Sequence, residues 1–103
     1  MSSSYAVCIR NAPKVESVVP AVEKLLGVTF NDHDAASGNG FNAYLLDDRD
    51  LDAGFSFDVH GQDREDIARR IYDHFVRHTN YEIELSGDYC ELIAERPAIK
   101  TAS

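Results

Sequence analysis

The sequence predicts an α+β sandwich in which two amphipathic helices cover one face of an antiparallel sheet. Two stretches, residues 17–26 and 63–80, carry apolar side chains at helical spacing. Around them apolar and polar residues alternate, which is the pattern of strands with one buried face. Helices that separate groups of strands within one short chain are typical of this class. The expected order is β-α-β-β-α-β with an extra C-terminal strand.

The chain has 103 residues, of which 44% are hydrophobic. This length suits one domain, residues 1–103, that builds a core without disulfides or metal. We expect the tail after about residue 97 to be flexible.

The first strand is expected over residues 5–10, where both alternating sets of side chains tolerate burial, as in a central strand. Ser17 is the expected N-cap of the first helix, because Pro20 then lies in the first turn, where an N–H would be unpaired anyway. Gly27 is the expected left-handed residue that ends this helix.

In the middle of the chain, residues 29–34 predict a weak strand or an extended segment, and residues 35–40 a flexible turn. Residues 41–46 and 55–60 alternate and predict a hairpin with an aromatic face on the core. Residues 47–54 are expected to form an acidic turn between them.

The second helix, over residues 63–80, is the most clearly predicted element. Its apolar stripe consists of Ile67, Ala68, Ile71, Tyr72, Phe75 and Val76. Asp63 is expected to cap its N-terminus through the carboxylate, and Asn80 to provide the left-handed stop. Residues 81–85 and 89–94 then predict two strands joined by a turn.

This order fits the ferredoxin-like sandwich, with both helices on one sheet face and the other face bare or buried in a homodimer. An open sheet with a different strand order is the alternative.

The net charge of −8 is concentrated in residues 32–66, which hold ten acids and two bases, whereas the rest of the chain holds eight of each. Such a field repels nucleic acid and anionic membranes and attracts a basic protein partner. The residues expected to form this acidic binding surface are Asp47, Asp48, Asp50, Asp52 and Asp58. A solvated surface without a partner is the alternative.

The N-terminal residues have neither a basic region nor a long apolar core, so no secretory signal is expected and the cytoplasm is the expected compartment. There, Cys8 and Cys90 would be reduced, and both are expected to be small core residues.

No catalytic residue, metal site or cofactor is predicted. Asp48, Asp50 and Asp52 resemble the start of a calcium loop, but the positions that require glycine and glutamate hold Ala53 and Val59. No nucleophile or phosphate-loop motif is present.

His74 and His78 have the four-residue spacing of a metal-binding pair, which Asp73 or His33 could complete. Their place near a helix C-terminus is already explained by the helix dipole.

A further pattern is aromatic. The side chains that could form a nucleic-acid stacking platform on a sheet are Tyr5, Tyr44, Phe55 and Phe57. Because the surrounding acids repel phosphate, these four are expected to belong to the core instead.

Several segments together resemble small acidic actinobacterial proteins, either uncharacterised ones or immunity proteins of polymorphic-toxin systems. They are LLGVTF (residues 25–30), a Gly-rich turn (37–40) followed by an aromatic strand (41–46), ARRIYDHF (68–75) and YEIELSGDYCELIAERPA (81–98). Phe41-Asn42 keeps only part of the aromatic pair usual after that turn. The resemblance implies an inhibitor that binds a toxin, and it carries no catalytic residue.

The expected function is therefore that of a non-enzymatic protein that presents its acidic segment to a basic protein, of which a toxin is one candidate. A dimeric regulatory module that binds a small ligand is one alternative. A small enzyme that uses His60, His74 or His33 as an acid–base group is another.

Overall fold

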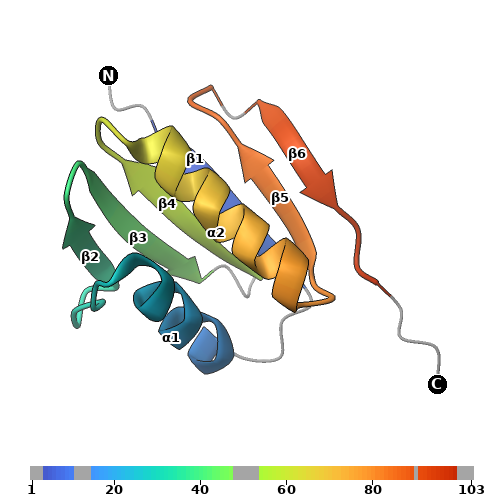
Figure 1. Ribbon diagram of the computed structural model, residues 1–103, viewed down its shortest axis with the longest axis horizontal. Coiled ribbons are helices and arrows are strands. Elements are labelled where there is room, and N and C mark those ends of the chain that lie inside the picture. The colour runs from blue at the N-terminus through green and yellow to red at the C-terminus, as the bar shows by residue number, and fades with distance from the viewer. Residues whose placement is uncertain (1–3, 11–14, 48–53, 90, 100–103) are drawn as a thin grey trace.

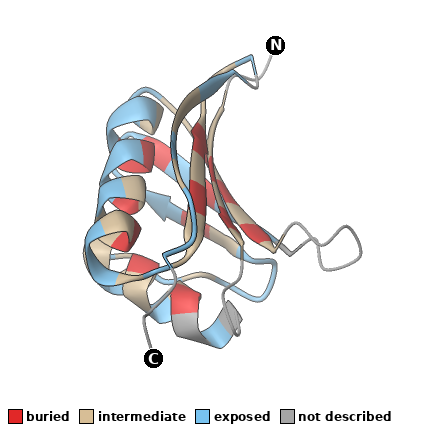
Figure 2. Ribbon diagram, turned by 90° about the vertical axis from the view of Figure 1, so that its right-hand side faces the viewer, coloured by how far each residue is buried: buried red, intermediate tan, exposed pale blue. Residues whose placement is uncertain are grey.

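The computed structural model describes residues 4–10, 15–47, 54–89 and 91–99. One six-stranded antiparallel sheet carries two helices on one of its faces (Figure 1). Viewed from the side, the helices form a second layer, and the buried residues lie between the two layers (Figure 2). The predicted α+β sandwich is confirmed.

The elements follow one another in the order β-α-β-β-β-α-β-β. They are β1 (Tyr5–Arg10), α1 (Val15–Leu26), β2 (Ala35–Gly38), β3 (Phe41–Asp47), β4 (Phe55–His60), α2 (Arg64–His78), β5 (Glu82–Ser86) and β6 (Leu92–Arg96). The strands are arranged as β2-β3-β4-β1-β5-β6, so β1 is central, as predicted.

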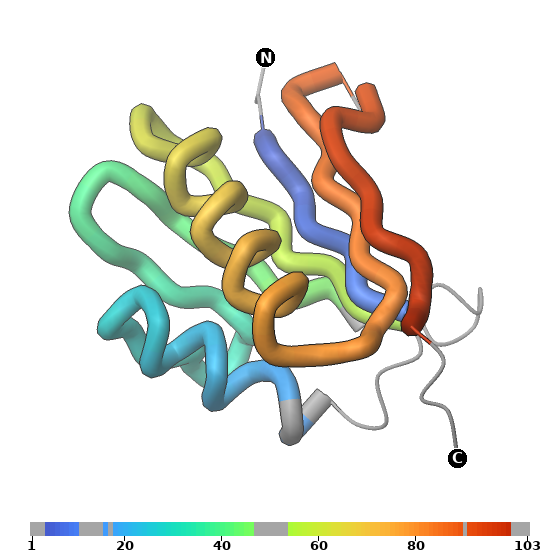
Figure 3. Tube along the Cα trace, turned by 45° about the vertical axis from the view of Figure 1, so that its right-hand side comes forward, coloured from blue at the N-terminus to red at the C-terminus, as the bar shows by residue number. Residues whose placement is uncertain are grey.

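The core forms where α2 packs on β1, β4 and β5. Alternate residues of the strands point toward the helices, among them Val7, Phe57 and Leu85, all almost fully buried. From α2, Ile71 and Phe75 meet them. Helix α1 lies beside α2, on the side of β2 and β3 (Figure 3).

Helix α1 begins earlier than predicted, which corrects the assignment of Ser17 as N-cap. Because the helix starts at Val15, Pro20 lies within it and offers no N–H to the carbonyl of Glu16. Glu16 is exposed, so water can hydrate that carbonyl. The burial of the apolar stripe outweighs this lost hydrogen bond. The predicted stop at Gly27 is confirmed by its φ of 68°.

The predicted turn over residues 35–40 is in part a strand, and residues 29–34 contain none. Strand β2 pairs with β3, and the methyl group of Ala36 is buried opposite Ala43. The small residues in this stretch have low strand propensity and predicted a turn. They form a strand because β3 supplies hydrogen-bonding partners for their backbone. Only the link through Gly40, with φ of 80°, turns the chain.

The two ends of α2 differ in detail from prediction. The Asp63 side chain makes no capping hydrogen bond. The helix ends at Thr79, whose backbone is extended and whose N–H and Oγ1 both donate to the Phe75 carbonyl, at 3.0 and 2.6 Å. Asn80 is therefore not a left-handed stop, because the Thr79 hydroxyl already satisfies the terminal carbonyl.

Beyond α2, the final hairpin is shifted toward the C-terminus relative to the predicted strands. Its turn is closed by the Gly87 N–H, which donates to the Glu91 carbonyl at 2.8 Å, so the second strand begins only at Leu92. Past this strand, the Ile99 N–H still donates to the Asn80 carbonyl.

Arg96 in β6 connects the edge of the sheet to the end of α2. Its guanidinium donates to the carbonyl oxygens of Val76 at 2.9 Å, Thr79 at 2.7 Å and Tyr81 at 2.7 Å. The last carbonyl groups of a helix have no partner within the helix, and the cation also complements the dipole. Arg96 thus joins β6 to the last turn of α2 and to the loop between α2 and β5.

Candidate functional site

The sheet face opposite the helices is covered by no other element within the described part of the chain (Figure 2). The alternation of each strand determines which side chains it presents. Those that give this face its chemical character are Cys8, Arg10, Tyr44, Leu46, Asp58, His60, Glu82, Glu84, Leu92 and Glu95. We call this set the open face.

Acidic side chains predominate on the open face. Asp58 of β4 lies between Tyr44 of β3 and Ala6 of β1 in the strand register. Across the sheet, Glu84 of β5 lies opposite Glu95 of β6. Like charges directly opposite each other are unfavourable in a sheet, so this pair does not help the fold.

One base partly compensates these acids. The Arg10 Nη1 lies 3.1 Å from Oε2 of Glu82 and 2.6 Å from Oε1 of Glu84. The hydrogen bond to Glu82 and the charge of Glu84 raise the pKa of Arg10. Within the described residues, neither Asp58 nor Glu95 forms an ion pair, so the open face keeps a negative surplus.

Large apolar side chains flank the acids. Tyr44 and Leu46 of β3 are 40% and 48% exposed, and Leu92 of β6 is 54% exposed. The Tyr44 ring meets His60 edge-on, with 5.3 Å between ring centroids. A surface with acids between exposed apolar groups combines the two features by which proteins recognise a partner.

Asp58 is the acid most affected by its surroundings. Burial raises the pKa of its carboxyl group, and the nearby His60 opposes this shift. The ionised form of this carboxylate therefore destabilises the native state. A charge retained under these conditions is a candidate for binding.

Cys8 lies on the open face rather than in the core, which corrects the prediction for this residue. It is half-buried, and burial, followed by the charge of Glu84, raises the pKa of its thiol. Because the thiolate is the reactive form, this cysteine is a poor nucleophile at neutral pH. Cys90 is outside the described residues.

The predicted acidic surface is described only in part. Asp58 lies on the open face, whereas Asp48, Asp50 and Asp52 fall outside the described residues, together with the proposed calcium loop. Asp47 ends β3, but its side chain is not among the described ones.

Glu82, Glu84 and Glu95 were missed because charge was counted along the chain, where bases elsewhere cancel them. The strand alternation would have placed them beside Asp58.

The aromatic residues do not form a platform. Phe55 and Phe57 belong to the core, as predicted, and Tyr5 is packed against it. Tyr44 points to the opposite side, so its assignment to the core was wrong.

Nor do His33, His60 and His74 lie together. His33 lies in the loop after α1, His60 on the open face, and His74 on α2 at the other side of the sheet. Across the ranges described, no three His, Cys, Asp or Glu residues are grouped as metal ligands.

Comparisons with known proteins leave the site without a precedent: no family model, no curated protein and no solved structure matches the chain. Among the described residues, no helix is both long and apolar enough to cross a membrane.

Proposed function

We propose that this chain is a non-enzymatic binding protein that docks a basic protein on its open face. The observation that supports this most directly is the negative surplus between exposed apolar side chains on an uncovered sheet face. The apolar groups supply area for burial, and the acids favour partners of opposite charge.

The proposal includes a ferredoxin-like topology for the central part of the domain. Its support is the order β3-β4-β1-β5, all antiparallel, in which β1 lies between the two strands that flank α2 in sequence. Strand β2 extends this unit at one edge and β6 at the other.

The charge of the open face favours a basic partner over a second copy of the chain. Two copies placed face to face would bring Asp58 and Glu95 of each against the acids of the other, which is unfavourable in a desolvated interface. A toxin neutralised in the cytoplasm is one partner that fits this proposal.

Removing Asp58 and Glu95, the open-face acids that form no ion pair with a described residue, should weaken capture of basic proteins. We compare the wild type with a face variant, Asp58→Asn with Glu95→Gln, each immobilised at equal density and exposed to a cell extract. The face variant should retain about three- to tenfold less of the salt-eluted basic proteins, since each interface charge contributes up to about 1 kcal/mol.

The matched control is a loop variant, Asp32→Asn with Asp34→Asn, which removes the same charge from exposed positions outside the open face. It should capture as much as the wild type. The proposal would be contradicted if the face variant captured as much basic protein as the wild type, or if the face and loop variants lost capture equally. It would also be contradicted if the wild type captured no basic protein.

Asp58→Asn alone should also stabilise the fold near neutral pH. A carboxyl group whose pKa is raised on folding destabilises the native state once it is ionised, and this penalty develops as pH rises from the unfolded pKa through the native one. The gain should be below about 1 kcal/mol, because the group is only partly buried. Urea unfolding at acidic and neutral pH measures it. A gain of the same size at a pH below both pKa values would show another cause.

A further inference from the structure

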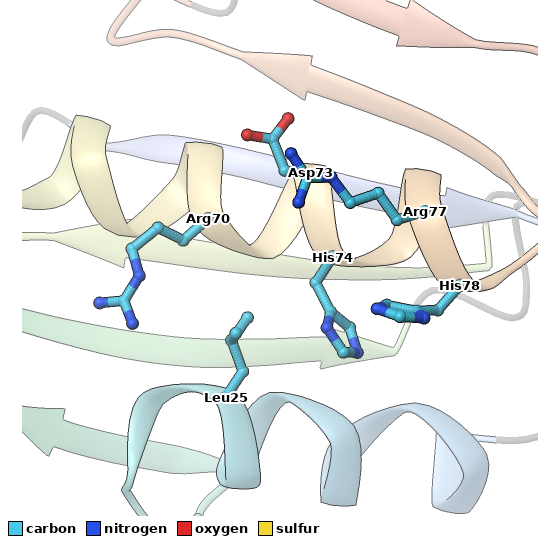
Figure 4. Close-up of a pocket in the computed structure, with 6 residues that line it drawn as sticks. All are labelled: Leu25, Arg70, Asp73, His74, Arg77 and His78. Carbon is cyan, nitrogen blue, oxygen red and sulfur yellow. The ribbon is translucent and has the colours of Figure 1, made fainter.

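A second surface lies on the helix layer, on the side of the sheet opposite the open face. A hollow of about 220 Å³ separates α1 from α2 and is lined by Leu25, Arg70, Asp73, His74, Arg77 and His78 (Figure 4). We call it the interhelical hollow. In a chain with a net charge of −8, a lining with two arginines, two histidines and one carboxylate is unusual.

The arginines of the hollow differ from the other arginines that the structure describes. Arg10, Arg64 and Arg69 form ion pairs with carboxylates, and Arg96 donates to backbone carbonyls. In contrast, no ion pair or hydrogen bond to another described residue engages Arg70 or Arg77. The guanidinium group of Arg70 is therefore available to a ligand on the side of α2 that faces Leu25, whereas Arg77 extends toward the side of Asp73 (Figure 4).

The histidines are placed beside these cations. The rings of His74 and His78 lie 4.7 Å apart, centroid to centroid. Burial, and then the charge of His78, lower the pKa of His74. In Figure 4, Arg70 and His74 extend toward the side of α2 that faces Leu25, whereas Asp73 extends toward the other side.

We propose that the interhelical hollow binds a small phosphate-bearing anion through Arg70, His74 and His78, with Arg77 at its rim. A guanidinium group matches phosphate oxygens with paired N–H donors, and protonated imidazole adds further charged donors. Leu25 of α1 adds an apolar side chain to the wall of the hollow that faces these donors (Figure 4).

The same lining disfavours a metal ion. Two histidines four residues apart can share a divalent cation, but the neighbouring guanidinium groups repel it. An anion instead relieves the mutual repulsion of the cationic side chains. Inorganic phosphate is therefore the first probe.

Phosphate binding is measured from backbone amide shifts in NMR titrations at constant ionic strength. Wild-type protein should show saturable shifts at residues 70–78 and near Leu25, beyond those caused by chloride. Arg70→Gln should raise the dissociation constant about tenfold or more, the usual effect of losing a charge-assisted hydrogen bond.

Arg69→Gln is the matched control, since it removes an adjacent exposed arginine whose partner is Glu65 and which lies outside the hollow. It should change phosphate affinity by less than about twofold, as expected for a screened exposed charge. Shifts no larger than with chloride, or equal losses in both variants, would overturn the proposal. So would a zinc response that Arg70→Gln leaves intact and His74→Gln abolishes.

Sulfate tests the role of the histidines, because its own charge does not change with pH near neutrality. The charged groups that line the hollow with the imidazoles are Arg70, Asp73 and Arg77 on α2, and its lining residue on α1, Leu25, is uncharged. A bound dianion favours imidazolium, so sulfate should bind more tightly as pH falls through the histidine range. A pH-independent affinity would overturn the assignment of His74 and His78 as ligands.

Discussion

Phe75→Ala should lower the free energy of unfolding by about 3–5 kcal/mol, the usual cost of deleting a buried aromatic side chain. Phe75 is 2% exposed and lies on the face of α2 that packs on the central strands. Loss of the ring removes apolar burial and leaves a cavity between two rigid layers that cannot collapse fully. Urea unfolding monitored by circular dichroism measures the effect.

Tyr89→Ala provides the surface comparison for this change. Tyr89 is 82% exposed, so its truncation should stay within about 0.5 kcal/mol of the wild type. If Phe75→Ala cost less than about 1 kcal/mol, α2 would not be packed as described.

Arg96→Lys should cost about 1.5–3 kcal/mol although it keeps the charge, because the three carbonyls require the planar fork of guanidinium. The side chain donates to the carbonyl groups of Val76, Thr79 and Tyr81, which connects β6 to the end of α2 and to the loop before β5. A lysine can satisfy only part of this set from one nitrogen. We expect faster hydrogen exchange of the last-turn amides of α2 as well as lower global stability.

Arg69→Lys is the control for side-chain chemistry, because Arg69 forms an exposed ion pair with Glu65 on the same helix. A pair of this kind contributes about 0.3–0.5 kcal/mol, and lysine can retain it. If the two lysine variants were equally stable, the contacts of Arg96 would have no role in stability.

The fold class was predictable because the strongest signals are periodic. The stripe of α2 and the alternation of β1, β3 and β4 are each set by the need to bury one face, and all four elements lie within one or two residues of their predicted positions. The central place of β1 followed from the mixed character of its two faces.

What local propensity could not predict depends on contacts between distant segments. Strand β2 exists because β3 pairs with it, although its own residues favour a turn. Helix α1 continues across Pro20 because Val18 and Val22 are buried on either side of that residue. In both cases tertiary packing overrides the local preference.

The sequence predicted the negative sign of the candidate site and one of its residues, Asp58. It did not predict Glu84 and Glu95, because strand pairing brings them onto the same sheet face as Asp58 from distant segments. The sequence analysis also did not predict the interhelical hollow. It explained His74 and His78 by the helix dipole, which does not involve the neighbouring arginines.

The position of β1 also determines when this chain can fold. The N-terminal strand lies in the middle of the sheet, where Val7 pairs with Phe57 on one side and with Leu85 on the other. These partners emerge from the ribosome long after β1, so the first strand is synthesised with both of its edges unpaired. Contacts so distant in sequence slow folding and extend the time during which those edges can pair with other chains. A high concentration of newly synthesised chains therefore favours aggregation through the unpaired edges of β1.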